Sequence, residues 1–452
     1  MVLLRKLLIE RGECMKIHSI YIDGYKNLVN IEIHMPEEYP VAAIIGNNGS
    51  GKSNILEALT LVFSSVYNEK SVNFRYKICY SIYNDSFEIS NLDGEKFLKN
   101  GKRVLKKDRR NSLPRGIFLY YCGETDRLKN MALNYVDRDF EKALKNFNEV
   151  EIKYISCVGL KEFTAALLAN AKYKNETFKK VCDLIGIQEI GGPIEFHLNR
   201  PNWSKRAFLT QDSFWNAQGS VAMLLHKLKD SGELIKLDEN RAIIKINSIS
   251  DISLDAENPF DLFVRFELLI QADILSNITF TIIKNDKSIY PDMLSEGEKQ
   301  LAQFLCLLEA TKDYRALFLL DEFDSFLHPN WQRRFAKIIS EIHITGQVLF
   351  TTHSPLTLGQ MQKESIRILK DGIAYEPTVD TFNRDITEVL EEIMEVGKRP
   401  VEVENAMQQF RNAVMHKEKE LAEDAILDLK KILSASDPFW ITVSHMMARL
   451  ER

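Results

Sequence analysis

The residues best suited to chemistry lie in one glycine-rich loop, Gly46–Ser53. The loop follows an apolar run, residues 41–45, precedes a helical pattern, and fits the phosphate-binding pattern G-x-x-x-x-G-K-[ST]. Its glycines let backbone N–H groups surround an anion, and the next helix directs its positive end at the same phosphates. The sequence therefore predicts ATP binding, with Lys52 on the β- and γ-phosphates and the Ser53 hydroxyl on Mg²⁺. The expected nucleotide-binding residues of the loop are Asn47, Asn48, Gly49, Ser50, Gly51, Lys52, Ser53 and Asn54.

Two carboxylates follow a second apolar run. Asp321 and Glu322 come directly after residues 316–320, which have the composition of a buried strand. The carboxyl end of a buried parallel strand borders the crevice in which α/β sheets bind ligands. Asp321 therefore suits the Mg²⁺ shell with Ser53, and Glu322 suits a general base or water-orienting group beside the γ-phosphate. Two acidic helix caps are the alternative, which the phosphate loop disfavours.

A histidine and a small-residue turn complete the set. His353 follows the apolar run 347–350, where its imidazole suits contact with the γ-phosphate and the attacking water. A lone histidine at a strand end otherwise has a structural role. Ser295 and Gly297 open a helical run, which is an anion-site geometry, although such a turn taken alone is a common helix cap.

Composition restricts the class of protein. The 452 residues suffice for two or three domains, and the hydrophobic and charged fractions, 45% and 27%, are ordinary for a soluble globular protein. The net charge of −5 gives no whole-protein field that would recruit nucleic acid. Six scattered cysteines without a C-x-x-C pair argue against a zinc site or a disulfide framework. The opening apolar stretch is too short for a membrane span, so we expect a cytoplasmic protein, starting at Met1 or Met15.

The hydrophobic periods outline the elements around these residues. A basic stretch, residues 99–110, suits phosphate contacts and equally suits a solvated loop. No heptad pattern lasts long enough for a coiled coil. The expected strands are 17–22, 29–34, 41–45, 74–80, 87–89, 116–122, 242–246, 278–284, 316–320 and 347–350, and the expected helices are 53–66, 138–147, 161–171, 175–184, 221–228, 261–270, 301–308, 401–417, 418–433 and 440–450.

The four elements together resemble the ABC-type ATPases, with a Walker A loop, a signature motif, a Walker B strand and a switch histidine. This resemblance implies an α/β fold: an ABC-type P-loop ATPase with a mixed sheet core, an antiparallel β lobe, a helical insertion and a helical C-terminal tail. The implied domains are an ATPase lobe with Walker A (15–125), a mainly helical insertion for a lid or partner docking (126–240), an ATPase lobe with signature, Walker B and switch histidine (241–375), and a helical extension (376–452).

The segment 321–329, D-E-F-D-S-F-L-H-P, is similar to the SMC, RecF and OLD branch of these ATPases. In that branch two protomers face each other head to tail around ATP. By resemblance, Ser295, Gly297 and Glu298 would complete the partner's nucleotide site, and Asp324 would lie near the dimer seam. The glutamine loop of the family is not placed. Because the residues after His353 show no D-x-D strand pattern, we expect no nuclease domain in this chain.

Within the branch, the layout resembles bacterial anti-phage defence ATPases such as the PtuA component of Septu and retron systems. This likeness rests on residues 22–28, on residues 120–124 and on the tail after Thr381. It implies a homodimer or higher homo-oligomer that hydrolyses ATP and gates a separate effector, a nuclease or toxin. A RecF-like repair clamp on duplex DNA, and a slowly hydrolysing scaffold that holds an effector, are the alternatives. The tail helices suit either packing on the core or a partner surface.

Overall fold

The computed structural model describes residues 15–35, 38–121, 130, 154–157, 159–204, 213–342, 344–370, 372–394 and 399–450. The chain divides into a larger unit that ends at Asn383 and a smaller unit that begins at Arg384. The helix expected over 138–147 lies outside the described residues. No helix in the described ranges is long and apolar enough to cross a membrane.

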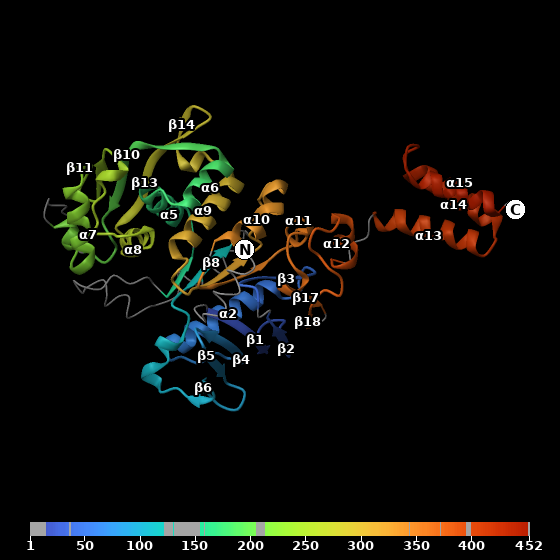
Figure 1. Cartoon of the computed structure of the whole chain (residues 1–452), viewed down its shortest axis with the longest axis horizontal. Coiled ribbons are helices and arrows are strands. Elements are labelled where there is room, and N and C mark those ends of the chain that lie inside the picture. The colour runs from blue at the N-terminus through green and yellow to red at the C-terminus, as the bar shows by residue number, and fades with distance from the viewer. Residues whose placement is uncertain are drawn as a thin grey trace. The chain divides into compact units, whose positions relative to one another are not determined.

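A seven-stranded sheet forms the centre of the larger unit (Figure 1). All neighbouring strands are parallel except the pair at one edge. The strands that carry the motifs are apolar along their length because helices and a second sheet bury both of their faces. In spatial order the strands are β18 (Ile373–Tyr375), β17 (Ile366–Lys370), β3 (Val41–Gly46), β16 (Gln347–Thr351), β15 (Leu317–Asp321), β8 (Ile117–Tyr121) and β9 (Ile155–Cys157).

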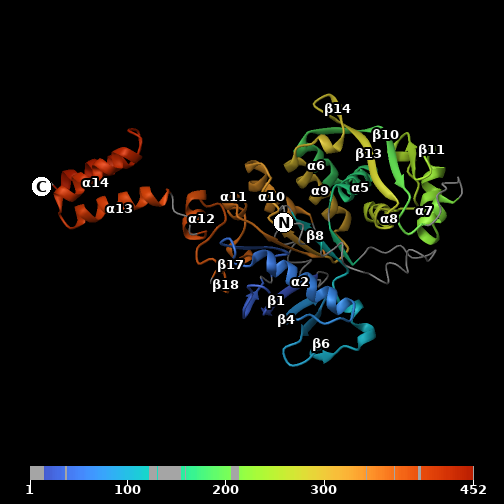
Figure 2. The same cartoon turned by 180° about the vertical axis from the view of Figure 1, so that it is seen from behind.

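Helix α2 (Lys52–Tyr67) lies between this sheet and an antiparallel β lobe, as Figures 1 and 2 both show. One hydrophobic cluster joins all three layers and includes Ile55 and Leu59 of α2, Leu319 of the central sheet and Ile78 of the lobe. On the opposite face, Phe335 of α10 (Pro329–Glu341) packs against Phe350, with ring centroids 5.6 Å apart. The lobe has the strand order β2 (Ile31–His34), β1 (Met15–Asp23), β4 (Arg75–Ile82), β5 (Asp85–Ser90), β6 (Lys96–Lys99) and β7 (Lys102–Arg103).

A third sheet, antiparallel and five-stranded, packs with helices at the other side of the larger unit (Figure 1). Its strands are, in order, β11 (Glu233–Lys236), β12 (Arg241–Ile246), β10 (Ile187–Asn199), β13 (Leu275–Lys284) and β14 (Lys287–Ile289). The helices of this part are α5 (Leu160–Tyr173), α6 (Glu176–Ile185), α7 (Gly219–Asp230), α8 (Pro259–Gln271) and α9 (Glu296–Thr311).

The span 126–240, expected to be mainly helical, therefore contains strands β9, β10 and β11 as well as three helices. Sequence analysis missed β10 because Gly191-Gly192-Pro193 interrupts its pattern and resembles a turn. After the interruption the alternation is regular, with Ile194, Phe196 and Leu198 buried. The fold class is nevertheless confirmed: a mixed sheet core in an α/β protein, with an antiparallel β lobe and C-terminal helices.

The smaller unit consists of helices. Its core includes Phe410, Leu429 and Phe439, which come from three successive helices. The guanidinium of Arg399 donates two hydrogen bonds, 2.7 and 2.9 Å long, to the carboxylate of Asp437. The helices are α12 (Ile386–Glu392), α13 (Val401–Met415), α14 (Lys419–Ile432) and α15 (Phe439–Leu450), and the three expected over 401–450 are confirmed.

Phe410→Ala should destabilise this helical unit by about 3–5 kcal/mol, because the buried ring leaves a cavity when it is removed. Amide hydrogen exchange of residues 401–450 in the full chain measures the free energy of local opening. Ile441→Ala is the control, since Ile441 is 66% exposed and its loss should cost no more than about 0.5 kcal/mol. Equal effects of the two substitutions would contradict the described core.

Candidate ATP site

Two glycines of the phosphate loop occupy positions that no other residue fits. Gly46 has φ 152°, and a Cβ there would lie 2.3 Å from the carbonyl oxygen of Leu369. Gly51, at φ 105°, is the N-cap of α2, and a Cβ there would lie 2.6 Å from Leu28 Cδ2. The loop is therefore pressed against β17 on one side and against the segment before β2 on the other. This close packing fixes the backbone N–H groups that the phosphate pattern requires.

The polar side chains of the loop fit a phosphate group. Ser50 Oγ is buried and has no hydrogen-bond partner within the described part of the chain. The Lys52 ammonium donates to the carbonyl oxygens of Gly46 (2.9 Å) and Asn47 (3.2 Å), at the mouth of the loop. Burial lowers the pKa of Lys52, while Glu322 and Asp321 raise it. An unpaired buried hydroxyl beside a buried ammonium is the donor set that binds the oxygens of a nucleotide's phosphates.

The structure brings together the two residues expected to hold Mg²⁺. Ser53 Oγ donates a 3.0 Å hydrogen bond to Asp321 Oδ1, although the two residues lie 268 positions apart. Thr351 Oγ1 donates to the same carboxylate oxygen at 2.6 Å. Burial raises the pKa of Asp321, and the two hydroxyl donors lower it. One hydroxyl and one carboxylate at the edge of a phosphate cradle match the few protein ligands that Mg²⁺ takes in nucleotide sites.

Glu322 and His353 lie at the same edge of the sheet. The backbone N–H of Glu322 donates to Thr351 Oγ1 at 2.9 Å, and Glu322 has φ 48°, a left-handed conformation that is costly for this residue type. Burial and the Lys52 charge lower the pKa of His353, and Glu322 opposes this effect. The imidazole is therefore neutral at neutral pH. The charges of Lys52 and Glu322 thus act on His353 in opposite directions.

A buried network holds the segment that carries His353. The Asp324 side chain is 2% exposed and accepts hydrogen bonds from Thr352 Oγ1 and Thr357 Oγ1, each 2.5 Å long. Gln332 Nε2 donates to the Asp324 carbonyl at 2.8 Å, and Ser354 Oγ donates to Gln332 Oε1 at 2.9 Å. Asp324, expected from resemblance near a dimer seam, is thus buried within its own chain. It connects the loop after β15 to the residues on both sides of the histidine.

The signature residues lie at the start of α9. Ser295 is the N-cap, Ser295 N donates to Glu298 Oε2 at 3.0 Å, and Lys284 forms an ion pair with the Glu298 carboxylate. A Cβ on Gly297 would lie 2.6 Å from the carbonyl oxygen of Phe326, so α9 packs against the loop after β15. No hydrogen bond or ion pair recorded among the described residues joins this turn to the phosphate loop of the same chain. Ser295 thus caps α9, which is the ordinary role that the sequence also allowed.

Sequence analysis did not single out Asn27, which braces the phosphate loop. Its Nδ2 donates to the Gly49 carbonyl at 2.7 Å, and its Oδ1 accepts from Asn54 Nδ2 at 2.6 Å. Next to it, the buried Glu57 carboxylate of α2 accepts from Tyr25 OH at 2.9 Å and pairs with Lys26. Residues 22–28 carry a family resemblance, but their types and spacing predict no chemistry. Asn54, expected to bind nucleotide, reaches the loop through Asn27.

Comparison with known proteins agrees with this candidate ATP site. The family described as "AAA domain, putative AbiEii toxin, Type IV TA system" matches residues 41–127 and 167–359, more than half of the chain. The chain belongs to this family. Both matched ranges carry parts of the site, the first with the phosphate loop and the second with the signature turn, Asp321, Glu322 and His353.

Curated relatives of this AAA-domain chain include two retron ATPases and a Septu protein. "Retron Vc95 probable ATPase" of Vibrio cholerae serotype O1 biovar El Tor is 22% identical over 434 residues, 86% of this chain and 80% of that protein. "Retron Ec83 probable ATPase" of Escherichia coli is 31% identical over 155 residues, 31% of this chain and 28% of that protein. "Septu protein PtuA" of Bacillus thuringiensis is 28% identical over 155 residues, 31% of this chain and 38% of that protein. The expected resemblance to retron and Septu ATPases is confirmed.

Gly46→Ala should abolish ATP binding, because the added methyl group meets a strand backbone that cannot move. Gly49→Ala is the matched control: Gly49 also has positive φ, 81°, but a Cβ there meets nothing within 4 Å. It should cost only about 1 kcal/mol of backbone strain and retain binding. Titration of each purified variant with a fluorescent ATP analogue measures the difference. Equal affinities would show that the close approach to Leu369 does not shape the loop.

Proposed function

We propose that this chain binds ATP with Mg²⁺ and hydrolyses it. The observation that carries the proposal is the 3.0 Å contact between Ser53 Oγ and Asp321, beside the buried ammonium of Lys52 and the unpaired hydroxyl of Ser50. A hydroxyl, a carboxylate, an ammonium and a glycine cradle at the ends of adjacent strands are the parts that phosphoryl transfer uses. The relatives named as probable ATPases support the same activity.

Each residue has a distinct task in this proposal. The backbone N–H groups of residues 47–53 and the Lys52 ammonium bind the phosphates, and Ser53 and Asp321 hold the cation. Bound Mg²⁺ supplies positive charge against the β- and γ-phosphate oxygens. Glu322 orients the attacking water and accepts its proton. His353, kept neutral by burial and by Lys52, contributes a hydrogen bond near the γ-phosphate without adding charge.

We further propose that ATP closes a dimer in which Ser295, Gly297 and Glu298 of one protomer complete the nucleotide site of the other. The position of these residues supports the proposed dimer, because they lie at the N-terminus of α9. The backbone N–H groups there point away from the helix and can bind an anion. It also agrees with the finding that no hydrogen bond or ion pair among the described residues joins them to the phosphate loop of their own chain. In this scheme hydrolysis reopens the dimer.

The relatives from retron and Septu systems support a role in anti-phage defence, in which the ATP cycle gates a separately encoded effector, a nuclease or toxin. A scaffold that binds ATP with little turnover would place the same effector under the same control. The switch and the scaffold differ only in whether release of the effector depends on ATP hydrolysis. Both require a stable protein partner.

Glu322→Gln should retain ATP within about threefold of the wild-type affinity and reduce hydrolysis by about 10²- to 10⁴-fold, because the amide cannot accept the proton from water. Lys52→Ala should lose ATP binding itself. The measurements are nucleotide binding and phosphate release for both variants. Wild-type hydrolysis by Glu322→Gln would show that the base is misassigned.

The same Glu322→Gln protein, expressed with its neighbouring genes, tests the switch. Its mass and composition, measured with and without ATP, should show a dimer that forms with ATP and a second protein bound to it. Lys52→Ala is the control that should show no ATP-dependent change. A lone dimer that retains duplex DNA would contradict the effector proposal and favour a repair clamp.

A further inference from the structure

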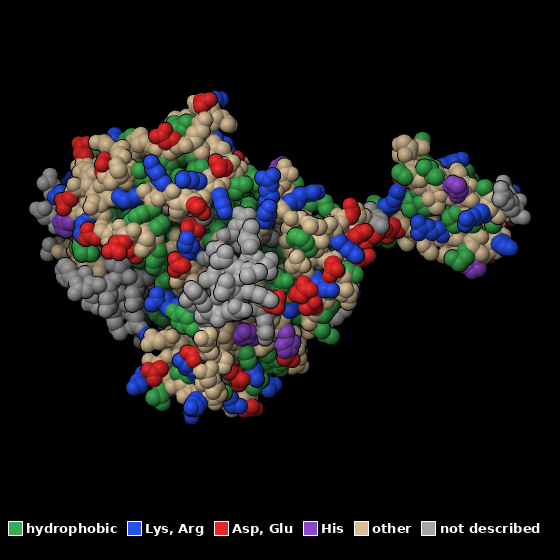
Figure 3. Space-filling model, viewed as in Figure 1, with side chains coloured by type: hydrophobic (Ala, Val, Ile, Leu, Met, Phe, Trp, Pro, Cys, Tyr) green, Lys and Arg blue, Asp and Glu red, His purple; other side chains and the backbone are tan. Residues whose placement is uncertain are grey.

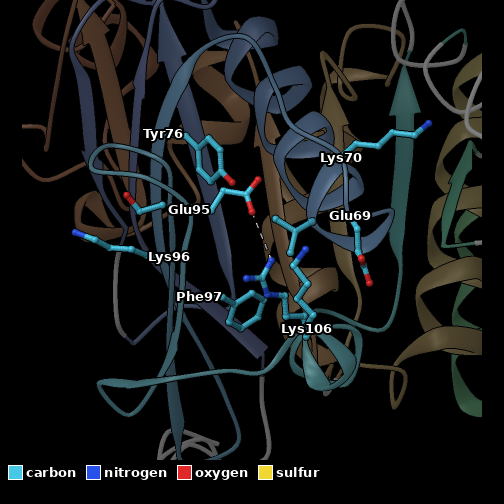
Figure 4. Close-up of a pocket in the computed structure, with 10 residues that line it drawn as sticks. Glu69, Lys70, Tyr76, Glu95, Lys96, Phe97 and Lys106 are labelled. Carbon is cyan, nitrogen blue, oxygen red and sulfur yellow. Dashed lines mark ion pairs between the residues drawn. The ribbon is translucent and has the colours of Figure 1, made fainter.

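A small pocket in the antiparallel β lobe lies apart from the ATP site. Its volume is about 100 Å³, and it lies between the end of α2, strands β4 to β6 and the turn before residue 110 (Figure 4). This volume is roughly the share of three water molecules in the liquid, and well below the roughly 300 Å³ of a pocket for a drug-sized ligand. The pocket therefore holds one polyatomic group and no nucleoside. The residues that line it include Glu69, Tyr76, Glu95, Phe97, Lys106 and Arg109.

Arg109 is the reason to expect a ligand. The residue is 9% exposed, and its Nε is buried without a hydrogen-bond partner among the described residues. Its recorded ion pair, with Glu95, spans 3.8 Å, and the Glu95 side chain is 59% exposed. The guanidinium also lies over the Phe97 ring, 5.8 Å from the centroid. A buried guanidinium with an unsatisfied donor is costly, and a planar acceptor group that meets its fork removes that cost.

Other donors face the same space. Burial and the Glu95 charge raise the pKa of Tyr76 to about 12, so its hydroxyl stays protonated and can donate. In Figure 4 the Tyr76 ring lies beside the Glu95 carboxylate, Lys106 extends toward the space between Glu69 and Glu95, and Lys70 and Lys96 point outward. The carboxylates of Glu69 and Glu95 oppose an anion. Glu95 is mostly exposed, so an anion on Arg109 can displace it into solvent.

The neighbouring Arg110 shows what a satisfied arginine does here. Its Nε donates to the Tyr67 carbonyl at 2.9 Å, and its guanidinium lies 4.7 Å from the Tyr67 ring centroid. Arg110 therefore caps the end of α2. Arg109, one residue earlier, pairs loosely with Glu95, and its Nε finds no acceptor in the part of the chain that the structure describes. Two adjacent arginines thus serve different purposes, and only the side chain of Arg109 faces the pocket.

The pocket is remote from the nucleotide phosphates. Helix α2 begins at the phosphate loop and has 16 residues, which corresponds to a length of about 24 Å. Val66, Glu69 and Lys70 line the pocket at the far end of this helix. A group bound there cannot touch ATP in the same chain.

We propose that this pocket binds one phosphate group, held by the Arg109 guanidinium with the Tyr76 hydroxyl and the Lys106 ammonium. A dianionic group fits better than a carboxylate, because it offers more oxygens to these three donors. Further cations lie on β6 and β7, namely Lys99, Lys102 and Arg103, and Lys99 forms an ion pair with Asp85. Figure 3 shows Lys and Arg side chains on this lobe, at the bottom of the view, interspersed with acidic ones. The phosphate can come from a free phosphorylated small molecule or from the 5′ end of a nucleic-acid strand.

The test uses the full chain carrying Lys52→Ala, which removes phosphate binding at the ATP site and makes the result independent of the proposed ATPase. Inorganic phosphate is titrated by calorimetry into this protein and into versions that also carry Arg109→Gln, Glu95→Gln or Lys107→Gln. Arg109→Gln should weaken phosphate binding at least about tenfold, as the loss of one charge-assisted pair predicts. Glu95→Gln should strengthen it roughly threefold or more, because a competing negative charge is removed.

Lys107→Gln removes the same charge from an exposed residue that does not line the pocket, and it should change the affinity by less than about twofold. Glu95→Gln alters an exposed side chain, so it tests the site even where Arg109→Gln does not fold. Equal effects of Arg109→Gln and Lys107→Gln, no gain in Glu95→Gln, or equal affinity for acetate and phosphate would each overturn the proposal.

A second arm identifies the source of the phosphate. Two oligonucleotides of the same length, one with a 5′-phosphate and one with a 5′-hydroxyl, are compared on the same set of proteins. An Arg109-dependent preference for the 5′-phosphate supports the site and assigns it to strand ends. Equal binding of the two oligonucleotides, together with Arg109-dependent binding of inorganic phosphate, supports the site and assigns it to a free phosphorylated molecule.

Discussion

The contact between Ser53 and Asp321 depends on the register of three parallel strands. Strand β16 lies between β3 and β15. Its residue Phe350 pairs with Ala43 of β3 on one side and with Leu320 of β15 on the other. This register aligns the carboxyl ends of the strands, so the helix that starts after β3 brings its first serine to the carboxylate that ends β15. Thr351, at the end of the middle strand, donates to the same carboxylate at 2.6 Å and accepts from the backbone N–H of Glu322 at 2.9 Å. A slip of one residue would turn each of these side chains to the opposite face of the sheet.

The loops beyond the strands hold their positions through buried polar groups. Asp324 accepts two hydroxyl donors in a region from which water is excluded, and an unpaired carboxylate there would be strongly destabilising. Thr352 and Thr357, which flank His353, in turn need Asp324, because their hydroxyl groups lose their acceptor without it. The segment that carries the imidazole is therefore held by residues of this buried network. On the opposite side of the phosphate loop, Asn27 serves the same purpose through the Gly49 carbonyl.

The sequence predicted the parts of the site whose signal is local. The phosphate loop follows from glycine spacing, and Asp321, Glu322 and His353 follow from their places after apolar strands. Asn27 and Asp324 carry equal structural weight but have no such signal, since their partners lie far along the chain or in turns of ordinary composition. Strand β10 was missed for a related reason: it pairs with β13 before and after the Gly-Gly-Pro interruption, with a register shift between Gly191 and Glu195, and with β12 from Ile194 onward. These distant partners stabilise an extended backbone that propensity disfavours. Strands β6 and β7 were missed because lysine-rich segments give no apolar period, while their pairing at the lobe's edge is tolerant of charge.

Helix α2 connects the two anion-binding regions of the larger unit. Its first residues belong to the proposed ATP site, and its last turn borders the Arg109 pocket. Along its length it is buried between two sheets in one continuous hydrophobic cluster, so it cannot bend or shift without disturbing both layers. Leu28 packs against the Gly51 position at the start of the helix, and Val66 lines the pocket at its end. Because Leu28 and Val66 both pack in the cluster that buries α2, the same hydrophobic core supports the phosphate loop and the wall of the pocket.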